Sequence, residues 1–146
     1  MSGLFNNRKA WACGLLVLAL FVIAGSARAQ VSVVVGKASK HTAGEAELKS
    51  YFSAVKFDWA DKAKVQIVDQ PESDLAKVFY ETFVGSSVTQ VRKEWMKLIL
   101  SGQAVAPLKC ANDAEVKKAV AADPNAVGFI ATASLDGTVR EIAKLK

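Results

Sequence analysis

Short apolar runs alternate along the chain with stretches in which apolar residues recur every three or four positions. Residues 31–35 form a β-branched run that ends at Gly36, which predicts a strand. Residues 64–69 alternate apolar and polar side chains and predict a second strand. Residues 127–131 form a third apolar run, and residues 138–145 predict a last strand or a short tail.

One helix is expected between the first and second predicted strands. Three more are expected between the second strand, residues 64–69, and the apolar run at residues 127–131. Each is predicted by an apolar stripe at i, i+3, i+4 spacing. Thr42 and Glu45 offer a capping box for the first helix, and Ser87 and Gln90 offer one for a later helix. Gly85 and Gly102 are expected C-terminal stops. The inner stripes are Leu48, Tyr51, Phe52 and Val55; Leu75, Val78, Phe79 and Phe83; and Val91, Trp95, Leu98 and Ile99.

The segment from residue 112 to residue 130 contains a helix, a stop and a strand in close succession. Asn112 and Glu115 form a capping box before an amphipathic stretch. Pro124 ends that helix because its ring cannot continue one. Gly128 lies inside the apolar run that follows, which predicts close approach of a packed helix or of a ligand. The resulting alternation of elements predicts an α/β sandwich around a mostly parallel sheet.

The first 29 residues have the pattern of a secretory signal peptide. Arg8 and Lys9 precede an apolar stretch that is short for a membrane span, and an Ala-Arg-Ala sequence precedes Gln30. Cleavage between Ala29 and Gln30 would leave residues 30–146 as one periplasmic domain, with no membrane span. A retained signal anchor is the alternative.

Charge and cysteine content narrow the function further. The chain has 19 basic and 14 acidic residues, but three of the basic ones lie in the predicted signal peptide, so the domain is nearly balanced. The charges are scattered, which does not indicate a nucleic-acid partner. Cys110 is the one cysteine after residue 29. We expect it to be buried; an intermolecular disulfide is the alternative.

Catalytic and metal-binding patterns are missing from the sequence. His41 is the single histidine, and no cluster of cysteine and histidine accompanies it. No nucleophile elbow, P-loop or Gly-rich dinucleotide motif occurs. We therefore expect no enzyme activity, no metal and no cofactor, and a structural or solvent-facing role for His41. Trp59 and Trp95 are expected to pack in the core, with sugar stacking as the alternative.

The turn at residues 70–74 has the features of an anion site. A helix that starts after a strand presents free backbone N–H groups and the positive end of its dipole. Ser73 could add its hydroxyl to such a site, or it could serve only as the N-cap of the helix. Glu72 and Asp74 oppose an anion here because they add negative charge.

Several segments resemble the substrate-binding components of phosphate ABC transporters. The segments are LKSYFSAVKFDWADKAKVQIVDQ, PESDLAKVFYETFVG, VRKEWMKLILSGQAVAP and DPNAVGFI, and their order and spacing cover nearly all of residues 31–146. The resemblance implies a single lobe of a type II periplasmic-binding-protein-like fold, with a mostly parallel or mixed sheet and helices on both faces. It also implies phosphate or another small oxyanion as ligand, and an ABC transporter as partner.

Two departures from this family affect the expected ligand site. Residues 30–146 suffice for one lobe, whereas the phosphate-binding members close two lobes on the ligand. Gln70 stands where the family has arginine, and Ser73 is followed by Asp74 and Leu75 where the family has glycine and threonine. Loss of the arginine removes a bidentate oxyanion partner.

Two functions are therefore carried forward. The first is a periplasmic solute-binding-like protein that binds a small oxyanion at a half-site. The second is a non-catalytic interaction module of the cell envelope that has lost ligand binding, which exposed apolar residues beside the turn would favour. The half-site of the first function would consist of Ser73, the amides of Asp74 and Leu75, Gln70, and the residues Ser39 and Lys37 after the first strand.

Overall fold

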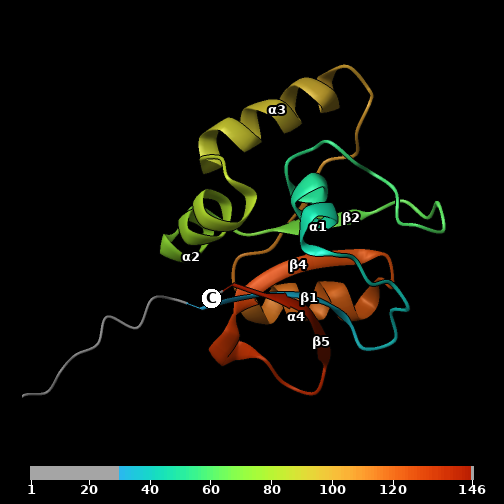
Figure 1. Ribbon diagram of the computed structural model, residues 1–146, viewed down its shortest axis with the longest axis vertical. Helices are drawn as coiled ribbons and strands as arrows, with labels where there is room; N and C mark the ends of the chain where they lie inside the picture. Colours follow the sequence, from blue (N-terminus) through green and yellow to red (C-terminus); the bar gives the residue numbers. More distant parts are fainter. Residues whose placement is uncertain (1–29, 146) are drawn as a thin grey trace, which may run out of the picture.

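The computed structural model describes residues 30–145, in which five strands form one mixed sheet (Figure 1). The strands lie in the order β3-β2-β4-β1-β5. β2 pairs in parallel with β3 and with β4, whereas β1 pairs antiparallel with β4 and with β5. The expected α/β fold with a mostly parallel or mixed sheet is confirmed, and the sheet is mixed. Its strands are β1 (Val31–Gly36), β2 (Gln66–Asp69), β3 (Leu108–Lys109), β4 (Ala126–Ala131) and β5 (Val139–Lys144).

Helices cover both faces of this sheet, as expected (Figure 1). Successive side chains of a strand point to opposite faces, so the fully buried β1 contributes to two separate cores. Val31, Val33 and Val35 belong to the larger core, whereas Val34 packs in the smaller one with α4. The helical segments are α1 (Glu45–Phe52), α2 (Asp74–Val78), η1 (Phe79–Val84), α3 (Val88–Leu100), α4 (Asp113–Ala122) and η2 (Thr132–Ser134).

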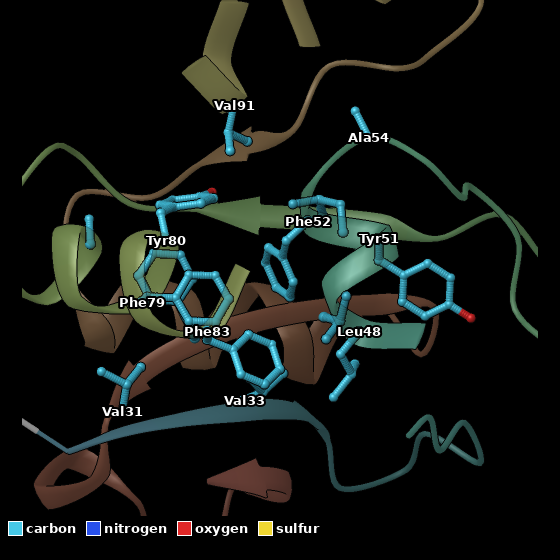
Figure 2. Packing of buried hydrophobic residues seen from close by; sticks show 14 of the residues in the cluster. Val31, Val33, Leu48, Tyr51, Phe52, Ala54, Phe79, Tyr80, Phe83 and Val91 are labelled. Atoms are coloured by element: carbon cyan, nitrogen blue, oxygen red, sulfur yellow. The ribbon is translucent and has the colours of Figure 1, made fainter. Parts of the chain in front are cut away.

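Aromatic rings fill the larger core between β1 and β4 on one side and α1 and η1 on the other (Figure 2). Phe79 stacks on Phe129 with ring centroids 4.1 Å apart, and it meets the edge of Phe52 at 4.7 Å. η1 is a π-helical continuation of α2, and its wider turn buries Phe79, Tyr80 and Phe83 together. Trp95 also lies in this core, which confirms the expected packing role.

α4 packs against the other face at two glycines. A Cβ on Gly128 would lie 2.7 Å from Cγ1 of Val116, and a Cβ on Gly36 would lie 2.2 Å from the carbonyl oxygen of Val120. Both helix residues are fully buried. The predicted close approach at Gly128 is therefore made by a packed helix rather than by a ligand.

The predicted helix termini are mostly confirmed. Ser73, Ser87 and Asn112 are the N-caps of α2, α3 and α4, and each accepts a hydrogen bond from the amide three residues later. Gly85 adopts the left-handed conformation after η1 with φ 86°, and Gly102 does so after α3 with φ 74°. These residues end their helices because glycine adopts positive φ without steric cost.

Four local predictions were wrong. Thr42 does not cap α1, whose N-cap is Gly44. The Glu115 carboxylate does not accept the amide of Asn112, as the capping box predicted, but accepts the amide of Ala111 at 2.7 Å. Val55 lies outside α1 and is exposed. The short strand β3 lies in a segment expected to be only a connection.

Candidate functional site

β2 and β4 end at the same edge of the sheet because they are parallel, and the candidate site lies there. The turn after β2 leads into α2, and Ser73 caps this helix by accepting the amide of Ala76 at 3.2 Å. The first-turn amides of Asp74 and Leu75 have no intrahelical acceptor. Asn112 begins α4 close by and caps it through the amide of Glu115 at 3.0 Å.

A cavity of about 390 Å³ opens between the N-termini of α2 and α4. Two helix N-termini that face one cavity add their positive dipole ends there, which favours a bound anion. The predicted role of Ser73 as an N-cap is thus compatible with a place in the cavity wall. The cavity is lined by Gln70, Pro71, Ser73, Ala111, Asn112, Asp113 and Ala114.

Gln70 and Asp113 hold the floor of this cavity together. The side-chain amide of Gln70 donates to Oδ1 of Asp113 and to the carbonyl oxygen of Phe129, both at 2.8 Å. Oδ2 of Asp113 accepts the amide of Ala131 at 3.1 Å and the hydroxyl of Ser134 at 2.7 Å. Gln70 therefore fixes the turn to β4 and α4, with both amide hydrogens directed at protein acceptors.

A buried carboxylate lies directly before the turn. Asp69 ends β2, its side chain is 3% exposed, and its Oδ1 accepts the hydroxyl of Tyr80 at 2.8 Å. Its Oδ2 accepts the ammonium of Lys109 and lies 3.5 Å from Nη2 of Arg92. The same Nη2 of Arg92 donates to the carbonyl oxygen of Gln70 at 2.9 Å. Burial, followed by the charge of Asp69, raises the pKa of Tyr80 well above its ordinary value.

A groove of about 670 Å³ lies on the other side of Pro71, which lines both cavities. Its polar end consists of the groups around Asp69 just described. Its walls come from α3 and from the segment that leads into β3. The apolar residues that line it include Trp95, Met96, Ile99, Ala106 and Pro107.

The structure does not bring all the predicted half-site residues together. Because β1 runs antiparallel to β4, its C-terminal end lies at the edge of the sheet where β4 begins. Ser39 follows β1 and donates its hydroxyl to the carbonyl oxygen of Pro124 at 2.7 Å. Lys37 is exposed in the same loop. Both residues therefore lie at the edge opposite Ser73, which separates them from Gln70, Asp74 and Leu75.

Sequence reasoning missed the group formed by Asp69, Tyr80, Arg92 and Lys109. The four residues come from β2, η1, α3 and β3, so no local spacing connects them. One signal was readable: Arg92 precedes Trp95 by three positions, which places a cation on the inner side of α3. Arg92 thereby supplies a guanidinium beside the turn in which Gln70 replaces the arginine of the resembled family.

His41 and Cys110 have structural surroundings. The His41 ring stacks on Trp59 with centroids 4.5 Å apart, and its Nε2 lies 2.8 Å from Oδ1 of Asn125. These contacts agree with the structural alternative for His41, and Trp59 packs in the core as expected. Cys110 is buried, as expected, and burial raises the pKa of its thiol. Within residues 30–145, no three His, Cys, Asp or Glu side chains gather as a metal site.

The fold is that of the periplasmic binding proteins, as solved structures with a similar chain course show. The neighbours include an ABC-type phosphate transport receptor from Vibrio cholerae, with 20% identity and a TM-score of 0.58. A second, from Clostridium perfringens, is described as a phosphate ABC transporter substrate-binding protein with bound phosphate, with 15% identity and a TM-score of 0.59. A third is PstS from Borrelia burgdorferi, with 11% identity and a TM-score of 0.56.

These similarities cover 78–79% of this chain and 45–47% of the three neighbours. The chain thus spans less than half the length of each of them, as expected for a single lobe. At these identities the comparison establishes the fold. No family model matches the sequence, and no curated protein matches it.

The predicted signal peptide, residues 1–29, lies outside the described residues. In the part of the chain that the structure describes, none of the helices has the length and apolar character needed to cross a membrane.

Proposed function

We propose that this chain is a periplasmic, solute-binding-like lobe that binds phosphate or another small oxyanion between the N-termini of α2 and α4. Residues 1–29 would direct export, and the domain of residues 30–146 would remain after cleavage. One observation carries the proposal: two capped helix N-termini open on a single cavity at the edge where β2 and β4 end. Phosphate is the ligand named for the Clostridium perfringens neighbour.

Hydrogen-bond donors for the anion would come from the backbone. The amides of Asp74 and Leu75 lie in the first turn of α2, although neither residue lines the cavity. The lining residues Asp113 and Ala114 lie in the first turn of α4, and a charged oxyanion accepts such amides strongly. The Ser73 hydroxyl accepts the Ala76 amide and retains its own proton for the ligand. Gln70 would act indirectly, because its amide holds the turn to Asp113. Ser39 and Lys37 would take no part, since they lie at the opposite edge.

The acidic residues near the cavity limit the expected affinity but do not close the site. Both carboxylate oxygens of Asp113 accept hydrogen bonds from protein groups, which disperses its negative charge. Asp74 is exposed, so water screens its charge. A single lobe buries only part of an anion, and binding in the millimolar range is the expected outcome for the isolated chain.

Isothermal titration of residues 30–146 with phosphate and with sulfate tests the proposal. Ser73→Ala would remove the helix cap together with the ligand contact, so a matched pair serves better. Ser73→Asp and Ser73→Asn both retain a good N-cap, but only the first places a negative charge beside the anion. We expect Ser73→Asp to weaken binding about tenfold or more and Ser73→Asn to remain close to the parent. Equal affinities of the two variants would refute the site.

A second function, an interaction module of the cell envelope without ligand, has one observation in its favour. Four large apolar residues are exposed along α3 and the segment that ends in the edge strand β3. An ABC transporter subunit or another envelope protein could cover them. If neither anion gives saturable heat at millimolar concentration, co-purification with envelope proteins becomes the informative experiment. The four residues are Met96, Leu100, Val105 and Leu108.

A further inference from the structure

We propose that the groove between α3 and the segment before β3 binds a small organic anion with an apolar body, such as an aryl or alkyl carboxylate. This site is separate from the cavity between α2 and α4, and it does not depend on phosphate binding there. Its volume of about 670 Å³ falls in the range of small-molecule pockets, about 300–1,000 Å³.

The walls of the groove suit an apolar ligand body. Trp95 lines the groove with the small part of its surface that is exposed, 6%, and its indole nitrogen donates to the carbonyl oxygen of Phe52 at 3.1 Å. This bond holds the ring in place, and a fixed aromatic face is a suitable surface for an apolar ligand. Ile99 and Pro107 line the groove beside it, and Met96 is 54% exposed in its wall. Methionine adapts its shape to different ligands because its side chain is unbranched and flexible.

At the polar end of the groove, two cations surround one buried carboxylate. Two cations, Arg92 and Lys109, share the single buried carboxylate of Asp69. Lys109 is 59% exposed and Arg92 is 34% exposed, so both retain N–H donors that can reach a ligand. Asp69 also lines the groove, and each of its carboxylate oxygens accepts a hydrogen bond from one of its own partners. Glu72, which is exposed, also lines the groove, so its lining residues carry two positive and two negative charges, and the excess of cations is confined to the group around Asp69.

This combination selects the chemical class of the ligand. An inorganic oxyanion would interact with the cations but would leave the apolar walls of the groove exposed to water. A neutral apolar molecule would cover the walls but would form no charge-assisted hydrogen bond with Arg92 or Lys109, and such bonds are stronger than those between neutral groups. An organic anion with an apolar body satisfies both ends at once. 4-Phenylbutyrate is such a molecule, and 4-phenylbutyramide is its neutral counterpart.

The test is titration of residues 30–146 with 4-phenylbutyrate, followed by heat and by tryptophan fluorescence. Two matched pairs of variants locate the site. Met96→Gln changes the groove wall, whereas Leu100→Gln changes an exposed residue one turn further along α3 that does not line the groove. Lys109→Gln removes a cation of the groove, whereas Lys93→Gln removes an exposed cation of α3 elsewhere.

We expect saturable binding of the carboxylate and at least fivefold weaker binding of the amide. Lys109→Gln should lower the affinity for the carboxylate about fivefold, which is the effect of losing one partly exposed cation. Met96→Gln should lower the affinity for both the carboxylate and the amide, and the two control variants should bind the carboxylate as tightly as the parent does. Inorganic phosphate should compete poorly.

Three results would overturn the proposal. The first is no saturable binding of the carboxylate by a chain that is folded by circular dichroism. The second is equal affinity for carboxylate and amide, and the third is equal effects of Met96→Gln and Leu100→Gln. Phosphate binding that depends on Ser73 would stand unaffected by any of these, so failure here is distinguishable from failure of the anion site.

Discussion

Replacing Tyr80 with phenylalanine removes one hydroxyl from the buried end of the candidate site. That hydroxyl donates to Oδ1 of Asp69 at 2.8 Å, and the Tyr80 side chain and the Asp69 carboxylate are almost wholly buried. Without it, Oδ1 loses a charge-assisted hydrogen bond in a residue that is only 2% exposed. Leaving such a group unsatisfied costs about 1.5–3 kcal/mol, and we expect a loss of about 2 kcal/mol in the free energy of unfolding.

The other tyrosine provides a matched control. Tyr51 is also buried, and its hydroxyl donates to Oε1 of Glu47 at 2.9 Å. Glu47 is 28% exposed and also accepts the ammonium of Lys56, so water and this lysine can replace the lost donor. Tyr51→Phe should therefore cost about 0.5 kcal/mol, the lower end for a typical hydrogen bond.

Urea denaturation followed by tryptophan fluorescence measures both losses. With a slope in the usual range for a small domain, the Tyr80→Phe midpoint should fall by about 1 M and the Tyr51→Phe midpoint by about 0.3 M. Equal shifts, or a larger one for Tyr51→Phe, would refute the reasoning, because the two substitutions differ mainly in the burial of the acceptor. A double-mutant cycle with Asp69→Asn should give a coupling of about 1 kcal/mol or more.

Two further predictions follow from packing and from burial. Gly128→Ala should lower the free energy of unfolding by about 1–3 kcal/mol, because the new Cβ would lie 2.7 Å from Cγ1 of Val116. Gly137→Ala should be nearly neutral, because no atom lies within 4 Å of a Cβ placed there. Equal urea midpoints for the two variants would contradict this prediction. Burial raises the pKa of both Tyr51 and Tyr80, the only tyrosines of the chain. Their contribution to stability is therefore complete below the ordinary tyrosine pKa of about 10 and falls as pH rises above it. Ultraviolet titration of the folded chain should show no phenolate near that pH, and a transition there would count against burial.

The helices were largely predictable from the sequence because their signals are local. The stripe that ends in Trp95, Leu98 and Ile99 and the caps at Ser87 and Asn112 depend on residues within a few positions. Val55 shows where such reasoning fails. It continues the spacing of α1, but Ala54 adopts φ 63°, which turns the chain and leaves Val55 73% exposed. The periodic pattern does not record where the backbone leaves the helix.

Strand direction was the main gap in predicting the site. A fully buried run such as residues 31–35 has the same composition in either direction, so it indicates a central strand without indicating its polarity. The antiparallel course of β1 moves Ser39 and Lys37 to the edge opposite Ser73. The residues of the expected half-site therefore lie at two opposite edges of the sheet. The element that lies beside the turn at residues 70–74 is instead the start of α4, which the sequence predicted as a helix but not as a neighbour of this turn.

The network around Asp69 also explains how the turn is held. Burying a carboxylate costs several kcal/mol, and a protein with apolar residues of similar size in place of a buried ion pair is often equally stable or more stable. Stability alone thus gives little reason for Asp69 at the end of β2. Its partner Arg92 donates to the carbonyl oxygen of Gln70, and the side chain of Gln70 joins α4 through Asp113. These bonds connect α3, the turn and α4, so we infer that the charged network fixes the wall between the two cavities in one position.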